Sequence, residues 1–303
     1  DPGQIAEACT HGHAERSQDR PYREYRAIDG AGYEDTDTMT DPEQEHDSTT
    51  PAASSTRKRG AIQSGDRVRQ MFNRIVPRYD LMNRVMTAGR DVAWRNIVAR
   101  QAASCGDDVL DVATGTGDLA FAIRQAGARH VIGTDFSEEM IEAAKKKAPK
   151  HGPDVTFMIA DALDLPFEDR RFDAVTVSFG LRNMTDYDAA LREMWRVLRP
   201  GGAAIILEMT PFKRPILGPP FRFYFEKVVP LVGGLLSGSL TAYRYLPSSV
   251  EAFPPAHELA DMLHEAGFKD VKYQLLGFGT VAIHSGTRPT DDEATQENTP
   301  HQG

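Results

Sequence analysis

The chain has 303 residues, of which 40% are hydrophobic and 26% charged, with a formal net charge of −9. This composition is close to that of soluble globular proteins, and the length leaves room for one large domain or two small ones. No apolar run approaches the roughly 18 residues of a membrane span, no signal pattern opens the chain, and neither cysteine lies in a zinc-binding cluster, so we expect a cytoplasmic protein without a structural metal.

The negative charge is concentrated at the two ends of the chain. Residues 29–47 contain eight acidic residues and no basic one. Residues 1–60 show no sustained hydrophobic periodicity, and such a segment cannot bury enough apolar surface to offset its ordering entropy. We therefore predict a disordered acidic extension over residues 1–60, a folded and mildly basic domain over 61–286, and a disordered tail over 287–303.

Helical patterns open the folded domain. Before Pro77 the apolar residues recur at helical spacing, at Val68, Met71, Phe72 and Ile75. A second apolar pattern covers residues 79–86, and a third helix is predicted over 91–103. We interpret residues 66–104 as a helical lid beside the functional site.

Strands and helices then alternate. Strands are predicted over 108–112, 131–135, 155–160, 174–178 and 203–208, and helices over 117–125, 137–147 and 186–198. This alternation indicates an α/β fold in which a parallel sheet is covered on both faces. A further helix over 256–266 precedes two strands over 271–276 and 281–285, whose hairpin spacing predicts an antiparallel end to the sheet.

A glycine-rich turn follows the first strand in the stretch VLDVATGTGDLA. Gly115, Gly117 and Ala120 fit the G-x-G-x-x-G/A pattern, whose glycines let a nucleotide approach the backbone at a helix N-terminus. Asp135 ends the second strand, where a carboxylate can accept hydrogen bonds from two ribose hydroxyls. These residues fit both NAD and S-adenosylmethionine, and so both an oxidoreductase and a methyltransferase.

Three features favour S-adenosylmethionine. Asp111, inside the glycine signature, would repel a pyrophosphate but suits the cationic methionyl end of the sulfonium cofactor. Asp161 and Ala162 follow the third strand, where a carboxylate can accept from the adenine amine and an apolar group can cover the ring; a loop cap is the alternative for Asp161. With the antiparallel hairpin, a class I S-adenosylmethionine-dependent methyltransferase fold is predicted, Rossmann-like and mostly parallel.

Four stretches resemble the ubiquinone/menaquinone biosynthesis C-methyltransferases: FNRIVPRYDLMNRVMTAGRDVAWR, VLDVATGTGDLA, SFGLRNMTDYDAALREMWRVLRPGG and YRYLPSSVEAFP. The second is general to methyltransferases, and the other three are specific to this family. The resemblance covers about Val68 to His284 and implies C-methylation of a prenylated quinol. Demethylmenaquinol is the expected acceptor, with the methoxy-benzoquinol of ubiquinone synthesis as the alternative. The implied cofactor contacts are Thr114, Asp135, Asp161, Ala162 and Ser178.

Candidates for the chemistry lie near the end of the fourth strand. A ring carbon becomes nucleophilic when a neighbouring hydroxyl loses its proton, so the site needs a base or a cation that stabilises phenolate. Arg182 is the candidate cation, because its pKa above about 12 keeps it charged, and Asn183 lies beside it. Tyr79, Asp80 and Asn83 of the predicted lid are further candidates, with caps and interhelical bonds as their alternative interpretation.

An aromatic and basic insert is predicted over residues 211–250. Residues 211–245 hold seven aromatic and five basic residues with one acid, which suits a tunnel for a prenyl tail or peripheral contact with the inner face of a membrane. A cap on the site or a homodimer contact is the alternative. We expect a quinol as substrate and no nucleic acid. An NAD-dependent oxidoreductase, a binding module with a vestigial site and a methyltransferase for another small acceptor remain alternatives.

Overall fold

The computed structural model describes most of the predicted folded domain. The described residues are 59–61, 90–211, 247–293 and single positions between 62 and 89 that include Met71, Asn73, Asp80, Asn83 and Thr87. The predictions for residues 1–58, Tyr79, the part of the insert over 212–246 and the tail after 293 lie outside the described residues.

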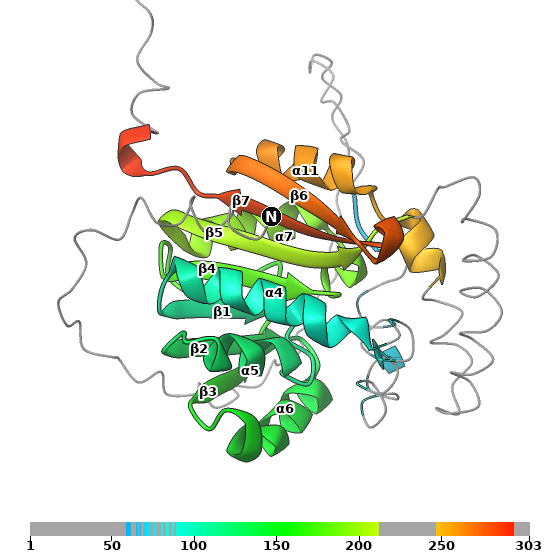
Figure 1. The fold of residues 1–303 in the computed structure, drawn as a ribbon, viewed down its shortest axis with the longest axis vertical. Helices are drawn as coiled ribbons and strands as arrows, with labels where there is room; N and C mark the ends of the chain where they lie inside the picture. Colours follow the sequence, from blue (N-terminus) through cyan, green and yellow to red (C-terminus); the bar gives the residue numbers. More distant parts are fainter. Residues whose placement is uncertain are drawn as a thin grey trace, which may run out of the picture. The chain divides into compact units, whose positions relative to one another are not determined.

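A seven-stranded sheet forms the centre of the domain, in the order β3-β2-β1-β4-β5-β7-β6 (Figure 1). The strands are β1 (Asp108–Val112), β2 (His130–Asp135), β3 (Val155–Ile159), β4 (Phe172–Ser178), β5 (Leu198–Met209), β6 (Lys269–Leu276) and β7 (Val281–Thr287). Strands β1 to β5 pair in parallel, and β7 pairs antiparallel with β5 and β6. The predicted α/β sheet with its antiparallel end is confirmed. The strand order reverses between β1 and β4, beyond whose carboxyl ends such sheets bind ligands.

Helices cover both faces of the sheet. They are α4 (Arg90–Cys105), α5 (Asp118–Gln125), α6 (Glu138–His151), α7 (Tyr187–Val197) and α11 (Ala256–Glu265). Successive residues of β1 point to opposite faces, so Val109 joins the core under α4 and α5, whereas Leu110 joins the core under α7 and α11. Side-chain caps begin two of these helices: Ser137 accepts from the Met140 N–H at α6, and Asp186 from the Ala189 N–H at α7.

Helix α4 is part of the core, which corrects the predicted extent of the lid. Its Val98 and Ala102 are fully buried against the sheet, and Figure 1 shows it crossing the sheet beside α5. Periodicity alone cannot separate a lid helix from a helix that packs on a sheet, because both present one apolar face. Only the residues before Arg90 are left as lid candidates.

Both boundaries of the ordered domain differ from the predicted ones. The Arg59 guanidinium, within the predicted extension, donates to both carboxylate oxygens of Asp188, at 2.7 and 3.2 Å, and also pairs with Glu265. Strand β7 continues to Thr287, and the Arg288 side chain donates to three main-chain carbonyls, those of Trp195, Arg196 and Leu198. The domain therefore extends past both predicted ends.

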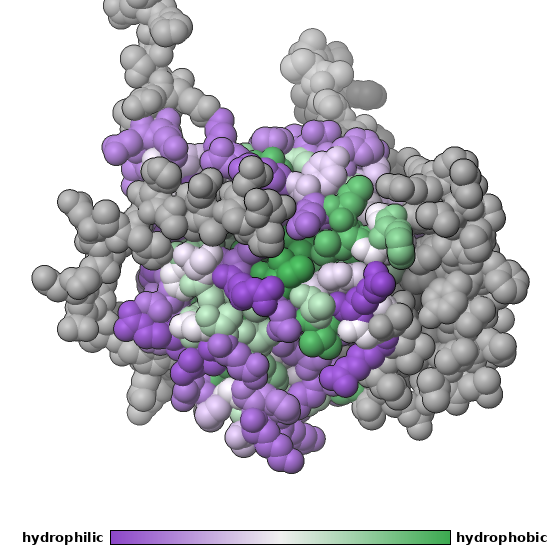
Figure 2. Space-filling view, viewed as in Figure 1, coloured by the Kyte–Doolittle hydropathy of each residue, from purple (hydrophilic) through white to green (hydrophobic). Residues whose placement is uncertain are grey.

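The described surface carries polar and apolar regions. Figure 2 shows hydrophilic residues predominating over β3 and α6, and hydrophobic residues gathered nearer the middle of the view. Exposed apolar side chains include Val92 of α4 and Phe278, and the Arg90 guanidinium lies 5.8 Å from the centre of the Phe278 ring. Among the described residues, no helix has both the length and the apolar character needed to cross a bilayer.

Candidate active site

The glycine loop joins β1 to α5 through left-handed backbone. Gly115 and Gly117 have φ values of 58° and 86°, a region that glycine adopts without the steric cost of a Cβ atom. A Cβ on Gly117 would also lie 2.7 Å from the ring of Phe157. Both glycines of the predicted signature are thus required by the turn itself, and the turn brings the backbone to the carboxyl edge of the sheet.

Asp135 lies directly beside this loop at the end of β2. One carboxylate oxygen accepts the Gly115 N–H and the other accepts the Ser137 N–H, both at 2.9 Å. The side chain is 7% exposed, and burial raises the pKa of Asp135 to about 6 while the backbone donors oppose that rise. Each oxygen keeps a lone pair for another donor. The carboxylate is therefore held in one orientation that fits a pair of ribose hydroxyls.

Asp111 of β1 is hydrogen-bonded to the glycine loop through Thr114. Its two oxygens accept from the hydroxyls of Thr114, at 2.6 Å, and Thr176 of β4, at 2.8 Å. The side chain is fully buried, which raises the pKa of Asp111 to about 6, and the positive charge of Arg95 opposes the rise. In this geometry Asp111 acts on the loop through Thr114. The sequence reasoning did not identify Thr176, which lies between two valines of β4.

Two buried polar atoms without a hydrogen-bond partner among the described residues lie at the end of β4 and in the turn that follows it. The Ser178 hydroxyl and the Asn183 side-chain oxygen are buried and have no hydrogen-bond partner among the described residues. Buried polar groups normally find a partner, so these two atoms point to a ligand. A Cβ on Gly180 would lie 2.6 Å from the Ala113 side chain, which means that this turn packs against the glycine loop.

Arg182 forms a buried ion pair with Glu208, the second last residue of β5. Its Nη1 donates to Glu208 Oε1 at 2.6 Å and to the Phe179 carbonyl at 2.7 Å. Glu208 was not identified from the sequence, although an acid within the apolar run IILEM is a usable signal because lone buried carboxylates are costly. The negative charge of Glu208 balances the guanidinium that we predicted as a phenolate partner.

The loop after β3 lies beside the end of β2. The Ala160 N–H donates to the Asp135 carbonyl at 3.0 Å, and Asp161 Oδ1 accepts the Leu163 N–H at 2.9 Å. Asp161 is exposed, and Ala162 packs partly against the core. Asp161 therefore caps its loop through Oδ1, and this bond leaves its other oxygen for a further donor.

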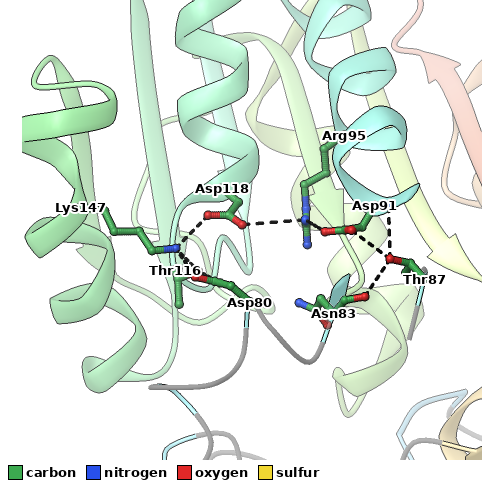
Figure 3. Close-up of polar contacts among 8 residues, drawn as sticks. All are labelled: Asp80, Asn83, Thr87, Asp91, Arg95, Thr116, Asp118 and Lys147. Carbon is green, nitrogen blue, oxygen red and sulfur yellow. Dashed lines mark hydrogen bonds and ion pairs between the residues drawn. The ribbon is translucent and has the colours of Figure 1, made fainter. Parts of the chain in front are cut away.

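Two polar residues that precede α4, Asp80 and Asn83, were predicted as candidates. Asp80 accepts the Thr116 hydroxyl at 2.6 Å and pairs with Lys147 at 2.5 Å. Asn83 is 5% exposed, and its side-chain nitrogen has no partner among the described residues. Figure 3 shows Asp80 pointing toward Lys147 and Thr116, and Asn83 lying beside Thr87. Asp80 thus contacts the loop, whereas Tyr79 is outside the described residues.

The described residues contain no cluster of three or more His, Cys, Asp or Glu that could hold a metal ion. The site instead combines a glycine loop, a fixed carboxylate and unpartnered buried polar atoms. This donor set fits an adenosine that carries a polar amino-acid end, and so fits S-adenosylmethionine.

Known proteins are similar in sequence to the folded domain of this chain. The demethylmenaquinone methyltransferase of Thermus thermophilus is 49% identical over 221 residues, which are 72% of this chain and 100% of that protein. That of Deinococcus radiodurans is 44% identical over 226 residues, 74% and 93% of the two chains. The ubiquinone/menaquinone biosynthesis C-methyltransferase of Desulfotalea psychrophila is 42% identical over 234 residues, 77% and 94% of the two chains.

Solved structures share the fold at lower identity. The [4+2]-cyclase SpnF matches with a TM-score of 0.58 and 19% identity over 76% of this chain and 99% of its own. An S-adenosylmethionine-dependent methyltransferase of Thermotoga maritima matches with a TM-score of 0.51 and 22% identity over 73% and 99% of the two chains.

The family model described as the ubiE/COQ5 methyltransferase family matches residues 61–288, which include every described site residue. The chain therefore belongs to the ubiE/COQ5 methyltransferase family.

Proposed function

We propose that the protein methylates the ring carbon of demethylmenaquinol to give menaquinol, with S-adenosylmethionine as the methyl donor. The observation that carries this proposal is the match at 49% identity to the whole length of the Thermus thermophilus demethylmenaquinone methyltransferase. The geometry of the site supports the cofactor, because the Asp135 carboxylate is fixed beside a loop whose left-handed glycines let a ligand approach the backbone.

Several residues would hold the cofactor in this proposal. Asp135 accepts the ribose hydroxyls, while Asp161 and Ala162 meet the adenine. The Ser178 hydroxyl, buried without a described partner, and Thr114 meet the methionyl end. Asp111 contributes through its bond to Thr114. When bound, the sulfonium supplies an electrophilic methyl group and leaves as a thioether, retaining the electron pair of the broken bond.

The acceptor is activated as a phenolate. Loss of a hydroxyl proton to solvent raises electron density on the adjacent unsubstituted carbon. After the new C–C bond forms, that carbon gives up its own proton and the ring oxygen takes one up, so one proton is released overall and the ring is again a quinol. Arg182 stabilises the phenolate oxygen, and Glu208 holds the guanidinium in place at 2.6 Å. The Asn183 side-chain oxygen, buried without a described partner, accepts a hydrogen bond from the second ring hydroxyl. Tyr79 and Asp80 remain candidates from the segment before α4.

A second acceptor has its own support. Relatives such as that of Desulfotalea psychrophila carry names that join ubiquinone and menaquinone biosynthesis. The methoxy-benzoquinol precursor of ubiquinone is therefore the second candidate acceptor, and it has the same reduced ring chemistry.

The prenyl tail of either acceptor calls for an apolar environment. The aromatic and basic composition of residues 211–245 supports a peripheral membrane contact of this segment. Flotation with anionic vesicles at low and high salt tests it: binding that weakens with salt is expected, and no binding at low salt would contradict it.

The acceptor is tested with labelled S-adenosylmethionine and a panel of reduced substrates. The panel contains demethylmenaquinol, the methoxy-benzoquinol and a simple phenol, and the product masses are measured. The proposal expects the fastest methylation with demethylmenaquinol. Activity on the methoxy-benzoquinol alone would contradict the proposal and favour the second candidate acceptor.

A further inference from the structure

Lys147 of α6 links three separate parts of the chain around the glycine loop (Figure 3). Its ammonium lies 2.5 Å from Asp80 Oδ2, 2.8 Å from Asp118 Oδ1 and 2.9 Å from the Thr116 hydroxyl. Asp80 belongs to the segment before α4, Asp118 begins α5, and Thr116 lies inside the loop. One cation therefore joins α6, α5 and the N-terminal segment.

Asp80 connects Lys147 to the glycine loop. Its Oδ1 accepts the Thr116 hydroxyl at 2.6 Å while its Oδ2 pairs with Lys147. Thr116 is 3% exposed and lies between the two left-handed glycines. A displacement of Asp80 would therefore also shift the glycine loop. The Gly115 N–H of this loop orients Asp135.

A second contact lies on the other side of Asp135. The Ser137 hydroxyl donates to Asn73 Oδ1 at 2.9 Å, and the Ser137 N–H donates to Asp135 Oδ1 at 2.9 Å. Asn73 belongs to the same N-terminal segment as Asp80. Asn73 and Asp80 therefore contact residues on both sides of the carboxylate that we assign to the ribose.

The surrounding charges show why the cation matters. Among the described residues, Arg95 and Asp91 of α4 are further charged neighbours: Arg95 Nη1 lies 2.5 Å from Asp91 and 3.9 Å from Asp118. Without Lys147, the Asp80 and Asp118 carboxylates would repel each other, and Arg95 would offset this only in part, because it lies closer to Asp91 than to Asp118. The side chains of Lys147, Asp80 and Asp118 are 27%, 30% and 31% exposed, so salt weakens their attraction without abolishing it.

We propose that Lys147 is a positioning residue that holds Asp80 against the glycine loop, so that the loop keeps the arrangement that binds S-adenosylmethionine. The inference rests on the proposed cofactor and is independent of the acceptor. Lys147 acts through Asp80 and Thr116 and does not touch the cofactor. Its loss raises the KM for the cofactor and leaves kcat at saturation nearly unchanged.

Calorimetry with S-adenosylhomocysteine tests this proposal without any quinol. Lys147→Met is compared with Lys145→Met, because Lys145 lies on the same helix but is exposed and pairs with the exposed Glu142. We expect about fivefold weaker binding for Lys147→Met, no change for Lys145→Met, and recovery in Lys147→Arg. The KM for S-adenosylmethionine should rise by the same factor.

A double-mutant cycle with Asp80→Asn separates this role from a general loss of stability. If Lys147 acts through Asp80, adding Lys147→Met to Asp80→Asn weakens binding by much less than fivefold, and high salt reduces the wild-type advantage. Lys147→Gln replaces Lys147→Met if the latter does not fold. Equal affinities of the Lys147 and Lys145 variants, or fully additive effects in the cycle, would overturn the proposal. Failure of the wild-type protein to bind S-adenosylhomocysteine would contradict the proposed cofactor instead.

Discussion

Glu208 binds both the guanidinium and the backbone of Arg182 at the carboxyl edge of the sheet. Arg182 Nη1 lies 2.6 Å from Glu208 Oε1, and the Arg182 N–H donates to Oε2 at 3.2 Å. The side chains are 5% and 1% exposed. One buried carboxylate therefore fixes the turn after β4 and the cation within it, so the structural and chemical roles of Arg182 must be separated by experiment.

Arg182→Ala should lower both stability and turnover. Leaving Glu208 buried without its partner costs about 3–5 kcal/mol in the free energy of unfolding. A double variant, Arg182→Met with Glu208→Gln, removes both charges and keeps an acceptor for the Met209 N–H. We expect the double variant to regain most of the stability in denaturant unfolding, while kcat stays low and the affinity for S-adenosylhomocysteine stays near that of the wild type. Recovery of turnover together with stability would reduce Arg182 to a structural residue.

The affinity for the cofactor should rise with pH. Burial raises the pKa of both Asp111 and Asp135 to about 6 in the folded protein, above their ordinary value of about 3.9. From about pH 4 upward the unfolded chain binds fewer protons than the folded one, so these groups lower the stability of the ligand-free protein as pH rises through their folded pKa of about 6, and the change levels off near pH 7. Ribose hydroxyls donate to the ionised form of Asp135. Calorimetry should therefore show S-adenosylhomocysteine binding that strengthens from pH 5 to 7 and then levels off.

Asp135→Asn provides the control for this pH dependence. It should flatten the profile and weaken binding at pH 7.5, since hydrogen bonds to a charged group are worth about 1.5–3 kcal/mol each. Asp154→Asn should follow the wild type, because Asp154 is 65% exposed and pairs with Arg124 at 3.0 Å. A wild-type affinity that does not vary between pH 5 and 7.5 would remove Asp135 from the ribose site.

Truncation at two points tests where the domain begins. Removing residues 1–57 should leave turnover and Tm unchanged, because their composition does not predict a core. Removing residues 1–60 also removes Arg59, which pairs with Asp188 and Glu265. The loss of about 1 kcal/mol should lower Tm by roughly 2–4 °C. Equal Tm values for the two truncations would show that Arg59 does not contribute.

The sequence predicted the fold where the signal is local. The strand over 108–112 is confirmed at both ends, and Asp135 ends β2 as its spacing from Gly115 predicted. Such features depend on the periodicity and turn chemistry of neighbouring residues. The Asp135 variants thus start from a position that the sequence alone identified.

The contacts between distant elements were not predictable in this way. Lys147 and Thr116 meet 31 residues apart in the chain, and Glu208 meets Arg182 across 26 residues. The sequence KKK does not show which of the three lysines faces the glycine loop, because the rotation of the helix relative to the sheet depends on packing. The acid in the strand IILEM does carry a signal, but its partner becomes evident only when β5 is set beside the turn after β4.

The central claim is that a reduced ring is methylated at carbon. Purified protein, S-adenosylmethionine and demethylmenaquinone are incubated in parallel with dithionite and in air, and the product mass is followed with time. The account predicts a mass gain of one methyl group in menaquinol under dithionite and none in air, because an oxidised quinone ring is electrophilic and does not attack a sulfonium methyl. Equal rates on the two forms, or a methyl group on oxygen, would contradict it.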